Sequence, residues 1–355
     1  MPTKTLKPTI TDVAEAAGCS VATVSRVMNG KDAVSHKMEQ RIRDAVQQCS
    51  YVPIRKRKTR RTSGKGSILS HGAVTLLWSA SRTMNLTGEN LLQGLTDGLH
   101  AQGITLNLDY LDTSGRVPTS LESGLVDGFI IHGMPDEKIL TLLRKHPVVW
   151  LFQQGSHLFG DRVQPDHVRA GELASEYFYE HGIKHVCCVT DSRNDAFAIA
   201  KARTCGFLEK SSTFKFKVDL IDGEAQNSSP TQGTETMALR RMANEAAKAF
   251  ANLSPKPEAV FVANHLGPFL HMELAQLGIV PMRDVCLIAG NTSVCSQHHL
   301  FPEPITIRIF SEKIGKLGAL RLRERIENPD LPESTTCVKP KLHIPSSEPI
   351  SSPDG

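Results

Sequence analysis

The start of the chain places apolar residues at the spacing of a short helix. Val13, Ala14 and Ala17 recur every three to four residues, which is typical of one helix face packed on a core. Thr9 and Asp12 fit a capping box, in which the first residue caps the helix and the acid three positions later bonds back to it. The pattern therefore predicts a helix that begins directly after Thr9.

Two further helices are predicted after short breaks. Gly18 suits the left-handed conformation that ends a helix, and Ser20 is placed to cap the next one over residues 21–28. Ser35 is placed to cap a third helix over residues 36–49. The pattern predicts three short helices, the first two joined by a tight turn.

From His71 onward, apolar strands alternate with amphipathic helices. The predicted strands cover residues 73–78, 104–110, 126–131, 148–152, 185–189, 259–263 and 285–289. The predicted helices cover residues 91–102, 170–181 and 269–278. Repeated strand–helix units predict an α/β fold with doubly wound parallel sheets. Because this part is long for one such sheet, we expect two subdomains with a cleft between them.

Composition favours a folded cytoplasmic protein. The chain has 355 residues, of which 40% are hydrophobic and 22% charged, so it can bury sizeable cores. It contains no run of about 18 apolar residues, and its first residues lack the apolar stretch of a secretory signal. The eight cysteines are scattered without a Cys-x-x-Cys pair, which indicates reduced thiols. We expect no membrane association.

The net charge of +4 conceals an asymmetry. Residues 1–65 hold 14 Lys and Arg against 5 Asp and Glu, a balance of +9, whereas the remainder holds 27 against 32, a balance of −5. A basic head on a mildly acidic body indicates that the head meets a polyanion. Nucleic acid is the first candidate and an anionic membrane surface the second.

The first two predicted helices have the pattern of a helix-turn-helix, whose second helix enters the major groove of DNA. Arg26 can bond to guanine, and Val21 and Ala22 suit a thymine methyl group. The polar residues that can hold phosphates are Thr9, Ser20, Thr23, Ser25, Asn29 and Ser35. The alternative is that these hydroxyls serve only as helix caps, and for three of them both roles can hold at once.

Residues 9–53 resemble, without gaps, the DNA-reading headpiece of the lac repressor (LacI/GalR) family. The resemblance is carried by Thr9 to Gly30, by Val34-Ser35 and by Tyr51-Val52-Pro53. It implies a transcription regulator with a sugar- or metabolite-binding body. It also implies that Val21, Ala22 and Arg26 read bases.

A basic segment joins head and body. Six of the seven residues from Arg55 to Arg61 are basic, which favours a flexible segment that adds phosphate contacts. The resemblance implies a hinge helix here, with a Leu that wedges into the minor groove. Arg60 stands at that position, and an Arg can enter a narrow groove without wedging it open. Arg55, Arg57 and Arg60 are therefore the candidate minor-groove and phosphate contacts.

The body resembles the periplasmic-binding-protein-like effector domain of the same family. The matching motifs are Asp166 to Gly171, His181 to His185, Arg203 to Phe207, Val262 to Asn264 and Pro304 to Ile307. The resemblance implies an effector bound in the cleft between the subdomains. The candidate effector-binding residues are Trp78, Ser79, Arg82, Gln153, Asp166, Arg203, Asn264 and Asn291.

The chain departs from the family pattern where acidic groups are expected in the pocket. Asn264 is followed by His265 instead of Asp, and Asn291 replaces a carboxylate. With Arg203 kept, the expected pocket is less negative, which weakens the choice of any particular neutral sugar. Purely structural roles for three of these residues stay open. Arg203 can be a helix-start residue paired with a surface carboxylate, Trp78 a core aromatic, and Asp166 a helix cap.

No metal, cofactor or catalytic centre is predicted. His181, His185, Cys187 and Cys188 have the types of metal ligands, but neighbours on a strand point to opposite faces. The chain lacks the patterns Gly-x-Ser-x-Gly, Gly-x-Gly-x-x-Gly and His-Glu-x-x-His, so no enzyme activity is expected.

We therefore predict a cytoplasmic, homodimeric transcription regulator, a repressor by family precedent. It binds a pseudo-palindromic operator in double-stranded DNA and responds to a small-molecule effector, a sugar or related metabolite. The predicted parts are a headpiece (1–53), a basic hinge (54–72), an effector-binding and dimerisation body (73–345) and a disordered tail (346–355). The alternative is a sugar-binding or enzymatic body whose basic head serves only to localise it.

Overall fold

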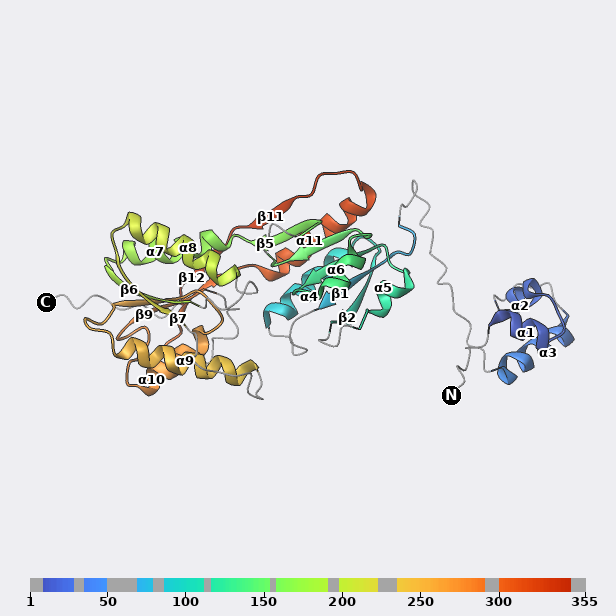
Figure 1. Cartoon of the computed structure of the whole chain (residues 1–355), viewed down its shortest axis with the longest axis horizontal. Helices are drawn as coiled ribbons and strands as arrows, with labels where there is room; N and C mark the ends of the chain where they lie inside the picture. The colour runs from blue at the N-terminus through green and yellow to red at the C-terminus, as the bar shows by residue number, and fades with distance from the viewer. Residues whose placement is uncertain are drawn as a thin grey trace. The chain divides into compact units, whose positions relative to one another are not determined.

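The structure is a computed structural model of the whole chain (Figure 1). It describes residues 9–28, 35–49, 69–78, 86–111, 116–153, 158–190, 198–222, 235–290 and 300–345. The chain divides into two compact units, Met1–Ser63 and Gly64–Gly355, which we call the head and the body. Among the described residues, no helix is both long enough and apolar enough to span a bilayer.

The head is built from three helices around a small apolar core. They are α1 (Ile10–Ala16), α2 (Val21–Met28) and α3 (His36–Gln48). Their buried residues are Val13, Ala14, Ala17, Val24, Ile42 and Ala45. The three helices predicted from the spacing of apolar residues are thus present.

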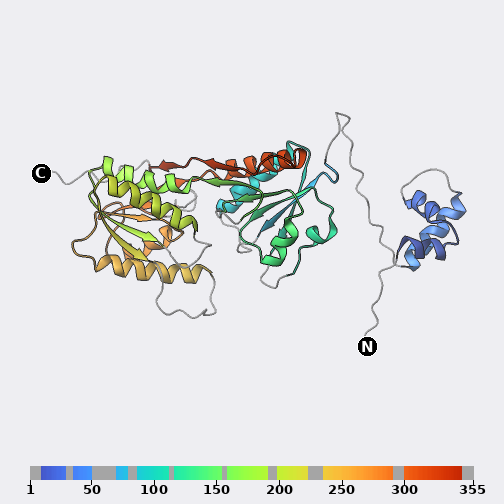
Figure 2. The ribbon, with the colours of Figure 1, turned by 45° about the horizontal axis from the view of Figure 1, so that its top comes forward.

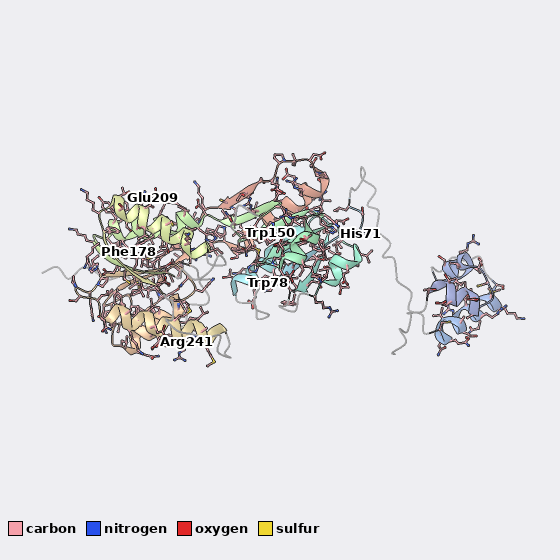
Figure 3. The ribbon with its side chains drawn as sticks, in the orientation of Figure 1. His71, Trp78, Trp150, Phe178, Glu209 and Arg241 are labelled. Carbon is pink, nitrogen blue, oxygen red and sulfur yellow. The ribbon has the colours of Figure 1, made fainter. Side chains whose placement is uncertain are left out.

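The first lobe of the body is a six-stranded parallel sheet in the order β11-β5-β4-β3-β1-β2. Its strands are β1 (Ala73–Trp78), β2 (Thr105–Tyr110), β3 (Gly128–His132), β4 (Val148–Leu151), β5 (Asp161–Pro165) and β11 (Thr335–Val338). Its helices are α4 (Leu86–His100), α5 (Thr119–Ser123), α6 (Glu137–Leu143) and α11 (Ser311–Glu327). One sheet face packs on α4 and α11, and the other, with Trp150, packs on α5 and α6. Trp78 and Trp150 both lie in this lobe (Figure 3).

The second lobe has a six-stranded sheet in the order β12-β10-β9-β8-β6-β7, parallel except for the last added strand, β12. Its strands are β6 (His185–Thr190), β7 (Lys217–Asp222), β8 (Ala259–Val262), β9 (Cys286–Ala289), β10 (Ile305–Arg308) and β12 (Lys341–His343). Its helices are α7 (His167–Glu180), α8 (Ala198–Thr213), α9 (Glu235–Ala251) and α10 (Gly267–Gln276). The α7–α8 pair covers one face and the α9–α10 pair the other.

The chain crosses between the sheets at three places, and each crossing leaves the carboxyl end of a parallel strand. The strands β5, β10 and β11 end at Pro165, Arg308 and Val338, and α7, α11 and β12 follow in the other lobe. Val338 lies opposite Pro165, and Lys341, which opens β12, lies opposite Arg308. The crossing segments therefore run side by side (Figure 2). This connectivity makes the carboxyl edges of the two sheets face each other.

Two glycines allow α7 and α8 to pack closely. A Cβ atom on Gly171 would lie 1.9 Å from the carbonyl oxygen of Arg203, and one on Gly206 would lie 2.1 Å from that of Val168. Both neighbours are backbone atoms that cannot move aside without shifting a helix. The close contact fixes the position of Arg203 along α8 relative to the first turn of α7.

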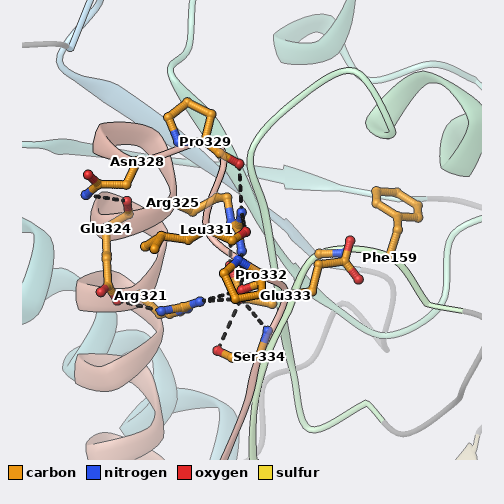
Figure 4. Close-up of polar contacts among 12 residues, drawn as sticks. Phe159, Arg321, Glu324, Arg325, Asn328, Pro329, Leu331, Pro332, Glu333 and Ser334 are labelled. Atoms are coloured by element: carbon orange, nitrogen blue, oxygen red, sulfur yellow. Dashed lines mark hydrogen bonds and ion pairs between the residues drawn. The ribbon is translucent and has the colours of Figure 1, made fainter.

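A buried carboxylate anchors the end of α11 and the chain that follows it to the first sheet (Figure 4). Asp161, which is fully buried at the start of β5, accepts hydrogen bonds from Arg325 Nε at 2.8 Å, Arg321 Nη2 at 2.8 Å and the Ser334 backbone at 2.8 Å. Burial alone would raise the pKa of this carboxyl, but the hydrogen bonds from Arg325 and Arg321 outweigh it and lower the pKa. The ionised carboxylate thus holds two arginines and one backbone segment together.

Asp161→Asn should destabilise the first lobe by about 3–5 kcal/mol, because the nearly buried guanidinium of Arg325 loses its counter-charge and that of Arg321 keeps only the exposed Glu324. Urea unfolding followed by tryptophan fluorescence measures this, since both tryptophans, Trp78 and Trp150, lie in this lobe. The exposed control Asp97→Asn should change stability by less than about 0.5 kcal/mol. The difference in the free energy of unfolding between wild type and Asp161→Asn should shrink as the pH falls below about 4, because the pKa of Asp161 in the folded state is depressed. Equal stability of both variants at pH 7 would contradict this assignment.

Gly206→Ala should lower the melting temperature, although Ala is the better helix former by about 1 kcal/mol. The added methyl group would meet a backbone oxygen of α7, and such overpacking costs about 1–3 kcal/mol. Ser212→Ala, at an exposed position of the same helix, is the matched control and should leave the melting temperature unchanged or slightly raised. A more stable Gly206→Ala protein would show that the helices can separate freely.

Candidate DNA interface and effector site

The first helix of the head begins with the predicted capping box. The Thr9 backbone N–H donates to Asp12 Oδ2 at 2.6 Å, the Thr9 hydroxyl donates to the same oxygen at 2.9 Å, and the Asp12 N–H donates back at 3.4 Å. These bonds from Thr9 lower the pKa of Asp12. Gly18 ends the helix with a φ of 60°, so the predicted left-handed stop is confirmed.

The turn between α1 and α2 is braced by a residue that the sequence analysis missed. Arg41 on α3 donates from Nη2 to the carbonyl oxygen of Ala17 at 2.9 Å. The same atom would lie 3.0 Å from a Cβ atom on Gly18, so the site also favours glycine sterically. The contact spans 24 residues, and no local pattern signals it.

The second helix turns two of the predicted base-reading residues to solvent. Val24 is buried in the head core and Val27 packs against it. Val21 is 40% exposed and Arg26 is exposed. Ala22 lies in α2, but its side chain is outside the described part of the chain. The exposed part of α2 thus presents an apolar residue at its start and a cation five residues later.

The hydroxyl residues of the head divide by the bonds they make. Ser20 Oγ accepts from the Thr23 backbone N–H at 3.1 Å and lies 2.8 Å from the Thr23 hydroxyl, as expected of a cap. Ser35 precedes α3 but its side chain forms no capping bond, which differs from the expected cap. Ser25 is half-buried. The candidates outside the described residues are Asn29, Arg55, Arg57 and Arg60.

The carboxyl edge of the first sheet carries an aromatic stack. Trp78 ends β1 and is almost fully buried, with its ring 4.1 Å from that of His132 and nearly parallel to it. Phe152 meets His132 edge-on at 5.7 Å, and half-buried Gln153 follows. Burial lowers the pKa of His132 to about 4, so its ring is neutral at pH 7. Trp78 packs in the lobe core at the carboxyl end of its strand.

The carboxyl edge of the second sheet carries a buried polar cluster, which we define as Arg203, His167 and Asn264. Arg203 Nη1 donates to the carbonyl oxygen of Ala263 at 3.1 Å, and Nη2 lies 3.2 Å from His167 Nδ1. Asn264 Oδ1 accepts from the Leu266 backbone N–H at 3.0 Å. Burial lowers the pKa of Arg203 to about 9, and burial with the nearby Arg203 charge lowers that of His167 to about 2.

The predicted effector residues are therefore only partly gathered. Arg203 and Asn264 share the polar cluster, whereas Trp78 and Gln153 lie on the edge of the other sheet. Asp166 accepts from the Arg169 backbone N–H at 3.0 Å and caps α7, as its alternative interpretation held. Ser79, Arg82 and Asn291 lie outside the described residues.

Arg203 does not have the surroundings of its alternative interpretation. It lies inside α8 and is fully buried, and its described hydrogen-bond partners are not surface carboxylates. His167 and His132 were missed as members of the two edges. His167 directly follows Asp166 in a family-like motif, which is the one sequence signal that pointed near it.

The histidines of the possible metal motif have other partners. His185 Nε2 lies 2.6 Å from Asp219 Oδ2, and His181 Nδ1 lies 2.8 Å from the Tyr177 carbonyl oxygen. No three potential ligands among His, Cys, Asp and Glu converge within the part of the chain that the structure describes.

Comparisons with known proteins place both units. The profile of the bacterial regulatory proteins of the lacI family matches residues 9–53, and that of the periplasmic binding protein-like domain matches residues 175–347. The HTH-type transcriptional repressor PurR of Aliivibrio fischeri is 24% identical over 96% of this chain and 98% of its own length.

Solved structures give the same fold. A LacI family transcriptional regulator from Enterococcus faecium with bound ribose is 20% identical, with a TM-score of 0.63 over 79% of this chain and all of that one. The lac repressor dimer bound to operator and the anti-inducer ONPF is 16% identical, with a TM-score of 0.60 over 95% of this chain and 98% of that one. The chain therefore combines a head that matches the DNA-binding domain of the lacI family of bacterial regulatory proteins with a periplasmic binding protein-like body.

Proposed function

We propose that this protein is a repressor of metabolic genes whose affinity for an operator is controlled by a small-molecule effector, a sugar or related metabolite. The observation that carries the proposal is that one chain combines a candidate DNA-reading helix with a buried polar cluster. The head exposes Val21 and Arg26 on the second helix of a helix-turn-helix, and the body buries a polar cluster at one of two facing sheet edges.

The related proteins support both halves of the proposal. PurR is named a transcriptional repressor, the lac repressor structure contains an operator, and the Enterococcus faecium regulator holds ribose. Those properties belong to those proteins, and the shared head and body make them the best expectation for this one. The protein would act in the cytoplasm, where bacterial genomic DNA is found.

The parts of the chain have distinct roles in this proposal. Residues 1–53 read DNA, residues 54–72 join head to body and contact the backbone, residues 73–345 bind effector and dimerise, and residues 346–355 form a tail. Two heads in a symmetric dimer would bind two half-sites, so the operator should be pseudo-palindromic. Thr9, Ser20, Thr23, Ser25, Asn29 and Ser35 are the proposed phosphate contacts.

Effector control requires that the effector bind two body conformations with different affinity. The three crossing segments lie side by side between the lobes, so small backbone rotations there would change the gap between the sheet edges. A ligand that touches both edges therefore favours one of the two body conformations. In the dimer, that change of conformation would alter the spacing of the heads.

Selection of genomic fragments by the purified protein at near-physiological salt tests the proposal. We expect an enriched pseudo-palindrome beside metabolic genes. Retention without a shared sequence would mean that the head binds DNA only as a polyanion, and turnover of a bound metabolite would point to an enzymatic body. Either outcome would overturn the proposal.

Arg26→Ala should weaken binding to the selected operator by about 1–3 kcal/mol and blunt discrimination at one base pair. The reason is that Arg26 is exposed on α2, where its guanidinium can reach a guanine edge. Arg43→Ala is the matched control, since Arg43 is exposed on α3 and pairs with Glu39 at 2.6 Å within that helix. Fluorescence anisotropy on operator variants measures both. Unchanged affinity and discrimination would remove Arg26 from base readout.

Arg57→Gln with Arg60→Gln should flatten the plot of log affinity against log salt by about 2 units if the basic segment touches phosphates. The matched control removes two exposed body charges, Lys256→Gln with Lys341→Gln, and should leave the slope unaltered. Titrations at several salt concentrations measure the slope. If the hinge variant kept the wild-type slope, the segment would be a passive linker.

A further inference from the structure

The guanidinium of Arg203 is a buried cation whose hydrogen-bond partners are neutral. The residue is fully buried, and among the described residues its hydrogen-bond partners are the Ala263 carbonyl oxygen and the His167 ring. Arg325 offers an internal comparison, because it is slightly more exposed and yet bonds to the Asp161 carboxylate through two nitrogens. Among the described residues, Arg203 has no such carboxylate. A buried cation without counter-charge is costly, and it therefore favours a ligand that supplies one.

The protonation of His167 follows from its bond to Arg203. Because a guanidinium only donates, His167 Nδ1 must accept, and the ring proton of the neutral imidazole then sits on Nε2. Asn264 is fixed in the same way, since its Oδ1 accepts from a backbone N–H and leaves the amide nitrogen as a donor.

The unsatisfied atoms of the polar cluster are all donors. Arg203 Nε, His167 Nε2 and Asn264 Nδ2 are buried and have no hydrogen-bond partner in the described part of the chain. The three residues are at most 5% exposed. Buried polar groups are nearly always paired, so unpaired donors beside a buried cation indicate a missing partner that only accepts. An oxyanion has that property, whereas a sugar hydroxyl both donates and accepts.

We propose that the effector carries an oxyanion, a carboxylate or a phosphate, which pairs with Arg203, while other acceptor atoms of the effector bond to His167 Nε2 and Asn264 Nδ2. The inference rests on the proposed function and names the chemical class of its effector. The uncharged aromatic stack of Trp78 and His132 on the facing sheet edge would receive the less polar part of the molecule. The rival source of negative charge is the chain itself, because Asp191 and Asp195 fall in a segment outside the described residues.

Asn264→Asp tests this proposal because it adds a carboxylate one residue beyond the carbonyl group that Arg203 contacts. If Arg203 has no counter-charge, the ligand-free variant should melt at a higher temperature than wild type. Inorganic phosphate, at constant ionic strength, should raise the melting temperature of wild type and have a much smaller effect on the variant. Asn252→Asp adds the same charge at an exposed position and should respond to phosphate like wild type.

A lower melting temperature of Asn264→Asp with an undiminished phosphate response would overturn the proposal and indicate that the chain already pairs Arg203. Should Asn264→Asp fail to fold, Arg203→Met replaces it, and phosphate should then leave its melting temperature unchanged, whereas the Asp97→Asn protein should respond to phosphate like wild type. An equal rise in wild type and Arg203→Met would likewise refute the oxyanion site.

Operator binding separates this inference from the function on which it rests. A deproteinised bacterial metabolite extract is split on an anion-exchange resin, and each fraction is added to full-length protein bound to its selected operator. We expect the retained fraction to change operator affinity at least tenfold, and Asn264→Asp to lose that response. Activity only in the unretained fraction would refute the anionic effector while leaving effector control intact. No activity in either fraction would refute effector control itself.

Discussion

The three crossings between the sheets all leave the carboxyl ends of parallel strands, and this constraint decides where the body can bind a ligand. The same topology that makes the carboxyl edges face each other also places the hinge segments beside them. A ligand between the edges therefore acts at the pivot of any lobe movement. The Asp161 cluster adds a fixed point, because it ties the end of α11 and the chain before β11 to the first sheet. Movement between the lobes is left to the short crossing segments.

The second edge shows how helix packing creates a polar site inside an apolar lobe. Gly171 and Gly206 let α7 and α8 approach until backbone atoms touch, and that contact sets Arg203 level with His167 on the first turn of α7. Apolar residues of α7, including Phe178, fill the rest of this layer. Proteins violate the rule that buried polar groups are paired mainly at functional sites. The unpaired donors are therefore best understood as the part of the fold that was shaped by a ligand.

Local signals made the head largely predictable. Thr9, Asp12, Gly18 and Ser20 act within a few residues of their own position, so their roles can be deduced from the sequence alone. The apolar strands of the body were predictable for a related reason, since strands buried on both faces form continuous apolar runs. Strand β5 escaped prediction because it starts with Asp161, a charged residue that is buried only because Arg321 and Arg325 arrive from 160 or more positions later. Long-range partners of this kind leave no local pattern.

The residue types of the effector site were predictable, but whether their free atoms donate or accept hydrogen bonds was not. Family-like motifs singled out Arg203 and Asn264, and the loss of expected carboxylates indicated a less negative pocket. What the sequence could not reveal is which atoms of these side chains are already occupied. That depends on two hydrogen bonds. Arg203 donates to His167, and the Asn264 side-chain oxygen accepts from the Leu266 backbone N–H. Only after those bonds are assigned do the remaining atoms all prove to be donors. The chemical class of the ligand therefore depends on which side-chain atoms lack a hydrogen-bond partner, and the residue types alone do not reveal it.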